Sequence, residues 1–223
     1  MSSGSITQRL EAVRASLPEG VTLVAVSKYH PQEAILEAYA AGQRRFGENH
    51  VMEMAEKAAA LPNDIEWHFT GHVQTNKIKF MAPFVHTIQS VDSFRALSEI
   101  NRHALRNDRV IRCLLQLHVA QEESKFGLTP DECLRLLAVE PWRELTGVRI
   151  TGLMAMATNT DDEVLIRHEF RTVRALFERV KTEYFADDEE FATLSEGMTD
   201  DYPIAVSEGA NMVRIGSAIF GPR

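Results

Sequence analysis

The stretch VTLVAVSKYHP at residues 21–31 places a lysine at the end of a short apolar run. A lysine ammonium is costly to bury unless it is paired or loses its proton, so strand interiors usually exclude it. Lys28 is therefore either a solvated strand end, with its stem along apolar surface, or a reactive group. In a partly dry pocket a lysine loses proton affinity and becomes an amine that forms a Schiff base with an aldehyde or ketone.

Two segments near the carboxyl end combine glycine with hydroxyl side chains. They read LSEGMT at residues 194–199 and RIGS at residues 214–217. Glycine lets backbone N–H groups approach an anion closely, although both segments could equally be ordinary turns and helix caps. The candidate phosphate-binding residues are Ser195, Gly197, Thr199, Gly216 and Ser217. A lysine facing a phosphate site fits a phosphorylated aldehyde, and pyridoxal 5′-phosphate (PLP) is one that enzymes hold through a lysine.

Eight short apolar runs could supply the strands that bring these residues together. The runs cover residues 21–28, 44–49, 66–71, 87–92, 110–119, 150–157, 191–198 and 212–221. Two of them, 21–26 and 110–119, are almost continuously apolar, which is typical of parallel strands covered by helices on their outer face. The pattern predicts an α/β fold, a (β/α)₈ TIM barrel that forms a single domain over residues 1–223. A doubly wound sheet is the alternative.

Helix signals lie before and between these runs. An extra helix is predicted at about residues 5–16, and Pro31 is predicted at the first position of the helix that follows Lys28. Thr129 and Thr160 begin capping-box sequences. A long helix is predicted at 162–184, with one apolar face made by Ile166, Phe170, Val173, Phe177, Val180 and Tyr184. Because carboxyl ends of barrel strands share one mouth, we expect Lys28 and the two glycine segments to meet there.

Composition narrows the class of protein. With 24 Lys and Arg against 32 Asp and Glu, the formal charge is −8, and no basic cluster suits a nucleic acid. Cys113 and Cys133 lack CxxC spacing, which fits a reducing compartment. No run of 18 apolar residues and no signal peptide stand out, so we expect a cytoplasmic protein without a membrane segment. His68 and His72 lack an evident third ligand, and no metal site is predicted.

Six motifs give the sequence a family resemblance that spans nearly the whole chain. In order they are VAVSKYHP, RRFGENHVME, EWHFTGHVQTNKIK, EESKFGL, ITGLMAMA and MVRIGSAIFG. Their order and spacing resemble the pyridoxal phosphate homeostasis proteins, often called the YggS or PROSC family. That family is similar to the barrel domain of alanine racemase without the second domain, which supplies the racemase with a tyrosine base.

The resemblance implies a PLP cofactor bound to Lys28 as a Schiff base. It also implies that Arg214 lies near the pyridine nitrogen and that Asn49 and His68 line the ring side. The phosphate would be surrounded by Ser195, Gly197, Met198, Thr199, Gly216 and Ser217. Since an arginine keeps its proton, Arg214 would leave the pyridine nitrogen unprotonated and the ring a poor electron sink. The implied role is a monomeric, non-catalytic PLP carrier that serves intracellular PLP homeostasis, with PLP-requiring apoenzymes as acceptors.

The chain departs from the family pattern at two places. Glu196 stands where the family usually has methionine, and a carboxylate aimed at a phosphate would repel it. Because neighbouring strand residues point to opposite sides, we expect Glu196 to point away from the phosphate that Ser195 faces. The second departure, His72 in place of a proline, changes the local loop more than the cofactor site.

Three alternatives remain open at the level of the sequence. One is a minimal PLP-dependent amino-acid racemase or transaminase with a base from its own barrel. Another is a cofactor-free Schiff-base aldolase whose loops at 195–199 and 214–217 hold a substrate phosphate. A third is a purely structural interaction protein, in which Lys28 has no chemical role.

Overall fold

The computed structural model describes residues 4–122 and 126–222 as a closed barrel of eight parallel strands in chain order. The strands are β1 (Thr22–Val26), β2 (Arg45–Glu48), β3 (Glu66–Phe69), β4 (Thr87–Val91), β5 (Ile111–Leu117), β6 (Val148–Ala155), β7 (Thr193–Ser195) and β8 (Met212–Ile215). Each strand pairs with the next, and β1 closes the barrel against β8. The predicted (β/α)₈ barrel is confirmed, and the doubly wound alternative was wrong.

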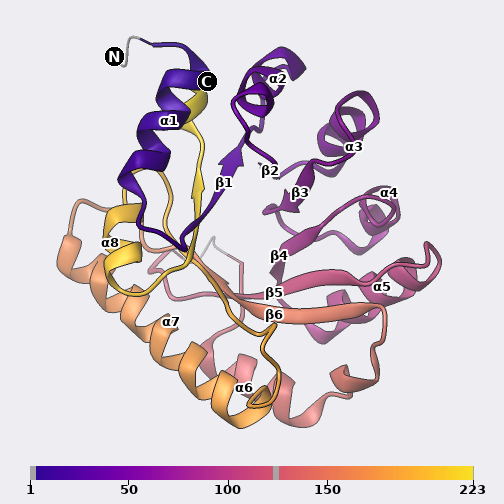
Figure 1. Ribbon diagram of the computed structural model, residues 1–223. Coiled ribbons are helices and arrows are strands. Elements are labelled where there is room, and N and C mark those ends of the chain that lie inside the picture. The colour runs from indigo at the N-terminus through magenta and orange to yellow at the C-terminus, as the bar shows by residue number, and fades with distance from the viewer. Residues whose placement is uncertain (1–3, 123–125, 223) are drawn as a thin grey trace.

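Helices follow the strands and cover the outside of the barrel (Figure 1). They are α1 (Ile6–Ser16), α2 (Gln32–Ala40), α3 (Val51–Ala60), α4 (Ile78–Met81), α5 (Phe94–Leu105), α6 (Pro130–Val139), α7 (Glu163–Tyr184), α8 (Tyr202–Ser207) and α9 (Ser217–Phe220), with short 3₁₀ turns at Thr75–Lys77 and Trp142–Glu144. Among the described residues, no helix is both long and apolar enough to cross a bilayer.

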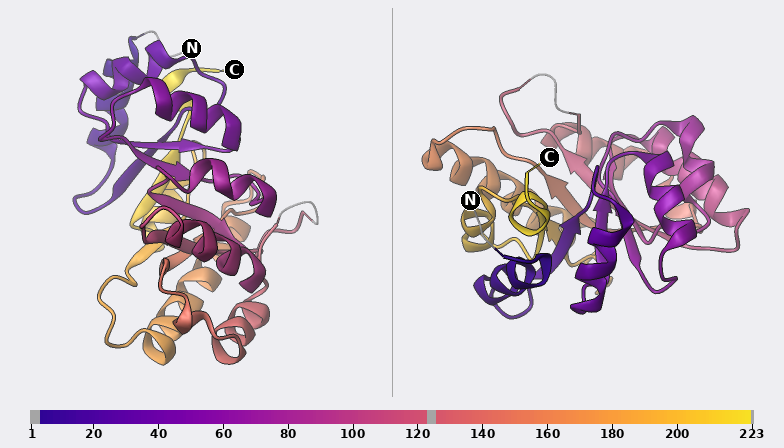
Figure 2. Two further views of the ribbon diagram at one scale, coloured as in Figure 1. Left: turned by 90° about the vertical axis from the view of Figure 1, so that its right-hand side faces the viewer. Right: turned by 90° about the horizontal axis from the view of Figure 1, so that it is seen from above.

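The extra amino-terminal helix packs beside the end of the chain. A capping box at Ser5 starts α1, and the Arg9 Nε group donates a hydrogen bond of 2.6 Å to the backbone oxygen of Ile219 in α9. Both views in Figure 2 accordingly place the two termini near each other. Residues 217–220, which the sequence assigned to the last strand, form α9 instead, because β8 ends at Ile215 before Gly216.

Helix starts differ from the sequence prediction by one or two residues. Thr129 caps α6 through the predicted capping box with Glu132. Pro31, however, is the residue before the first turn of α2 and not its first helical residue. At α7 the cap is Asp162, whose carboxylate accepts hydrogen bonds from two backbone N–H groups, so the capping box predicted at Thr160 was wrong.

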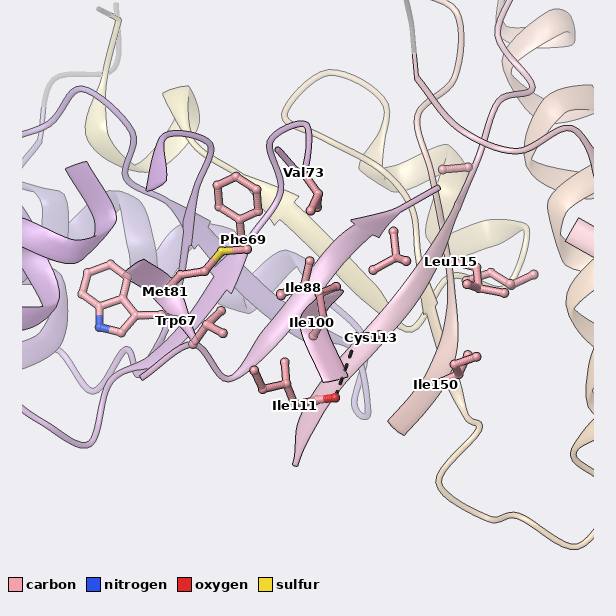
Figure 3. Packing of buried hydrophobic residues seen from close by; sticks show 14 of the residues in the cluster. Trp67, Phe69, Val73, Met81, Ile88, Ile100, Ile111, Cys113, Leu115 and Ile150 are labelled. Atoms are coloured by element: carbon pink, nitrogen blue, oxygen red, sulfur yellow. Dashed lines mark hydrogen bonds between the residues drawn. The ribbon is translucent and has the colours of Figure 1, made fainter. Parts of the chain in front are cut away.

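Side chains alternate between the two faces of each strand, as the pleat of a strand requires. Figure 3 shows the outer face, where Trp67 and Phe69 of β3 and Cys113 of β5 pack among buried apolar side chains. On each strand, the residues that alternate with these face the barrel interior. His68, between Trp67 and Phe69, is one of them. The same alternation carries the inner face of β1 from Val26 to Lys28, at the carboxyl end of the barrel.

Gly152 in β6 permits a close approach of two strands. Its φ is +156°, and a Cβ at this position would lie 1.8 Å from the backbone oxygen of Thr193 in β7. We expect Gly152→Ala to lower the free energy of unfolding by more than about 3 kcal/mol, since both the conformation and the space are lost. The quantity is measured by urea denaturation.

Gly20→Ala is the matched control for that substitution. Gly20 also has a positive φ, of +86°, but no atom lies within 4 Å of the added Cβ. Its cost should stay near 1–2 kcal/mol, roughly that of the backbone conformation alone. Equal losses in the two variants would contradict the role given to the close β6–β7 contact.

Candidate functional site

A cavity of about 280 Å³ opens at the carboxyl end of the barrel. It brings together six of the ten candidate site residues, which are Lys28, Met198, Thr199, Arg214, Gly216 and Ser217. They come from the segments that follow β1, β7 and β8. Lys28 and the two glycine segments therefore line the same cavity, as expected. The remaining lining residues are Val26, His30, Thr70, Met154, Met156, Asp200 and Gly221.

The peptide on each side of Lys28 is anchored by a buried ion-pair network. The Lys57 Nζ group donates a 2.9 Å hydrogen bond to the backbone oxygen of Ser27. On the other side, the backbone N–H of Tyr29 donates to Glu53 Oε1 over 2.6 Å. Tyr29 has a φ of +66°, a costly conformation for a residue with a side chain. The anchors therefore hold a strained turn in which Lys28 is half-buried at the cavity.

The network itself centres on the amine of Lys57. This amine also donates to Glu48 Oε1 and Glu53 Oε1, both at 2.7 Å, and Ser27 Oγ donates to Glu48 Oε1 at 2.7 Å. Burial raises the pKa of Glu48, although hydrogen bonds from Lys57 and Ser27 oppose that shift. Burial also opposes ionisation of Glu53, but the hydrogen bonds from Lys57 and the Tyr29 N–H lower its pKa overall.

Arg214 forms the floor of the cavity. It is 4% exposed, and its NH1 group donates to the backbone oxygen of Ser195 at 2.8 Å and to Ser195 Oγ at 2.7 Å. Its NH2 group donates to the backbone oxygen of Ala155 at 2.8 Å. These bonds use three of the five guanidinium N–H groups and leave two for a ligand. Burial lowers the pKa of Arg214 to about 10, so the side chain is still charged at neutral pH.

Hydroxyl groups from two loops face each other at one side of the cavity. Ser217 Oγ donates to Thr199 Oγ1 over 3.2 Å, which joins the loop after β7 to the start of α9. The backbone N–H of Met198 is taken by Asp201 Oδ1 at 2.5 Å. Thr199 Oγ1 accepts the Ser217 proton and keeps its own, which can serve an anion.

Four candidate residues lie outside this lining. Ser195 is fully buried beneath Arg214, where its Oγ donates to Gln89 Oε1 at 2.7 Å, and it does not line the cavity. Gly197 has a φ of +87°, and a Cβ there would lie 2.8 Å from atoms of Tyr202 and Ala205, so it serves packing against α8.

The other two candidate residues outside the lining are His68 and Asn49, which lie in different parts of the barrel. His68 is 1% exposed and lines a separate cavity at the amino-terminal end of the barrel, away from Lys28 and Arg214. Thr70, two residues after His68 and directly after the end of β3, lines the upper cavity instead. Strand alternation predicts that it faces inward, and its place after the strand end gives its depth. Asn49 has a buried Oδ1 with no hydrogen-bond partner among the described residues.

Glu196 is fully buried and does not line the cavity. Burial raises its pKa well above the usual range, and the charge of Arg214 opposes this shift only in part. Neither carboxyl oxygen has a hydrogen-bond partner within the part of the chain that the structure describes. The side chain thus lies outside the cavity, and its burial favours the neutral carboxyl over the carboxylate.

The comparisons with known proteins agree with this geometry. The family model of the alanine racemase N-terminal domain matches residues 1–223. A pyridoxal phosphate homeostasis protein from Haemophilus influenzae is 39% identical over 206 residues, which cover 91% of this chain and 85% of the relative. The chain belongs to the pyridoxal phosphate homeostasis protein family.

Solved structures support the same assignment. PipY of Synechococcus elongatus, solved without PLP, is 36% identical with a TM-score of 0.91, and the match covers 97% of this chain and 100% of that one. The same protein solved with PLP bound has a TM-score of 0.86. An alanine racemase from Clostridium difficile has a TM-score of 0.73 at 13% identity, covering 98% of this chain and 57% of the racemase, and shows the shared fold alone.

The network around Lys28 gives a prediction about stability. Lys57→Met leaves Glu48 buried without its cation, so we expect the free energy of unfolding to fall by about 3–5 kcal/mol in urea denaturation. Arg179→Met is the control, because the Arg179–Glu183 pair lies on the exposed face of α7. Exposed pairs contribute little, and its denaturation midpoint should not move. Equal midpoints for the two variants would refute the anchoring network.

Glu196 gives a prediction about pH. Its native pKa lies above its unfolded value, so the native state keeps a proton that the unfolded chain releases, and stability falls as pH rises above about 4.5. Glu196→Gln removes this loss. Relative to the parent protein, its free energy of unfolding should rise with pH from about pH 5, by up to about 1.4 kcal/mol per pH unit, until the native carboxyl itself ionises. Glu189→Gln, at an exposed position, should give a difference that is constant with pH. A constant difference for Glu196→Gln as well would contradict the burial of an unpaired carboxyl.

Proposed function

We propose that this protein binds PLP as a Schiff base with Lys28 and serves PLP homeostasis in the cell. The observation that carries the proposal is the convergence of an amine, a buried arginine and two hydroxyl groups on one cavity. Support also comes from the relatives, which are named pyridoxal phosphate homeostasis proteins, and from PipY, which was solved with PLP bound.

The residues present suit the chemical groups of PLP. The Lys28 amine suits an aldehyde, and the hydroxyls of Thr199 and Ser217 suit a phosphate. The unpartnered Oδ1 of Asn49, at the end of β2, is a polar atom that a bound group could satisfy directly or through water. Lys28, Met198, Thr199, Arg214, Gly216 and Ser217 are the proposed binding residues.

Arg214 favours a carrier over an enzyme. When bound, PLP supplies an electron sink for amino-acid chemistry, and the strength of that sink depends on protonation of its pyridine nitrogen. Arg214 donates hydrogen bonds and does not release a proton near neutral pH, so a nitrogen facing it stays unprotonated. We therefore propose a non-catalytic, monomeric carrier with apoenzymes as acceptors. A cytoplasmic location is supported by Cys113 and Cys133, which are both buried and unpaired.

The experiment that tests this function is an absorbance titration with PLP, followed by borohydride reduction and peptide mass mapping. The parent protein should show a visible Schiff-base band and a reduced adduct on Lys28, and Lys28→Ala should show neither. Lys79→Ala, an exposed lysine variant, should keep both, as should Glu196→Met, because that carboxyl lies outside the cavity.

Two outcomes would overturn parts of the proposal. A band that persists in Lys28→Ala would assign the Schiff base to another lysine. Steady exchange of the α-proton of free amino acids in deuterated water, lost in Lys28→Ala, would favour the racemase or transaminase alternative over the carrier.

A further inference from the structure

A second cavity, of about 310 Å³, opens at the opposite end of the barrel, where the strands begin. Four threonines line it with the charged and aromatic side chains of Arg45, Glu66, His68, His86 and Arg112. The proposed PLP function uses none of these groups. Such a concentration of donors and charges within one cavity raises the question of what it binds.

A chain of hydrogen bonds links this cavity to Arg214. Arg214 NH1 donates to Ser195 Oγ, and Ser195 Oγ lies 2.7 Å from Gln89 Oε1. Gln89 Nε2 in turn lies 2.9 Å from His68 Nδ1. Each of these side chains faces the barrel interior and is at least nine-tenths buried.

The direction of every bond in this chain follows from the arginine. A guanidinium can only donate, so Ser195 Oγ accepts from Arg214 and directs its own proton to the carbonyl oxygen of Gln89. The amide NH₂ of Gln89 is then left to donate to Nδ1 of His68. Burial, with the nearby charges of His86 and Arg45, lowers the pKa of His68 to about 3, so the ring is neutral. Its single proton therefore sits on Nε2.

This Nε2–H group is a donor without an acceptor. It is buried, and it has no hydrogen-bond partner among residues 4–122 and 126–222. An unmet donor in such a place costs free energy, so an acceptor, either a water or an anion, is expected beside it.

A metal ion is the obvious alternative at this place. One ligand atom each from Glu66, His68 and His86 lie within 4.8 Å of one another. However, a ring nitrogen that carries a proton offers no lone pair to a metal, and Nδ1 of His68 is already used by Gln89. Glu66 is also paired with Arg45 at 2.7 Å.

Charge points to an anion as well. Arg45 and Arg112 bring two positive charges to the cavity and Glu66 brings one negative charge. Outside the cavity, Glu190 lies 3.5 Å from Arg112 and pairs more closely with Arg149. The Arg112 guanidinium is thus the cation at this end that is least neutralised by its partner.

We infer that the cavity at the amino-terminal end of the barrel binds a small oxyanion, a carboxylate or phosphate group, that accepts hydrogen bonds from His68 Nε2–H and Arg112. Threonine hydroxyls around the rim supply further donors. This site is separate from the proposed PLP site and is joined to it through Gln89 and Ser195.

The test combines imidazole NMR with an anion titration of the PLP-loaded protein. Long-range ¹⁵N–¹H spectra should show His68 as the neutral Nε2–H form at pH 7. Inorganic phosphate, added at constant ionic strength, should shift the His68 signals and reach saturation. Arg112→Gln should weaken this binding by about tenfold or more, since it removes a charge-assisted hydrogen bond.

Arg149→Gln is the matched control. Arg149 also pairs with Glu190 but does not line the cavity, so this variant should bind phosphate within about twofold of the parent protein. His68 signals that do not respond to phosphate would overturn the inference. So would an Nδ1–H form of His68 whose signals saturate with Zn²⁺, which would assign a metal site.

Discussion

The buried guanidinium of Arg214 is the group on which the interior of this barrel depends. A charge that is 4% exposed persists only if its donors are satisfied, and the backbone oxygens of Ser195 and Ala155 do this from β7 and β6. Above it, Arg214 lines the upper cavity. Below it, the same charge fixes the direction of hydrogen bonds through Ser195 and Gln89 to His68. One permanently charged donor thus lines the upper cavity and also determines the direction of the hydrogen bonds that lead to the lower one.

Lys28 depends on a different kind of support. Its neighbours Ser27 and Tyr29 are bound by the Lys57 amine and the Glu53 carboxylate, which both belong to α3. The amine that faces the cavity is therefore distinct from the amine that is buried as structure. Lys57 thus has a structural role, whereas Lys28, 29 residues earlier in the chain, lines the cavity.

The sequence was sufficient to predict the barrel and many of the residues that line the upper cavity. Apolar runs locate all eight strands, and the rule that strand ends share one mouth brings Lys28 to the loops after β7 and β8. Motif resemblance could not separate residues that line a cavity from residues that support it. Ser195 and His68 carry the right groups for a cofactor, yet Ser195 lies beneath Arg214 and His68 lies at the other end. Their roles depend on depth within the barrel, which strand alternation does not give. Residues 123–125 of the EESKFGL motif lie outside the described residues.

Glu196 illustrates how strand geometry limits the effect of a substitution. A carboxyl next to a cofactor site suggests repulsion of a phosphate, but this side chain is fully buried and does not line the cavity. Among the described residues its carboxyl meets no hydrogen-bond partner, and burial raises its pKa well above the usual range. We therefore expect the substitution to lower the free energy of unfolding, by an amount that grows with pH, and not to weaken ligand binding. A charged residue can replace an apolar one beside a binding loop when the native state holds it neutral and the cavity lies on the other face.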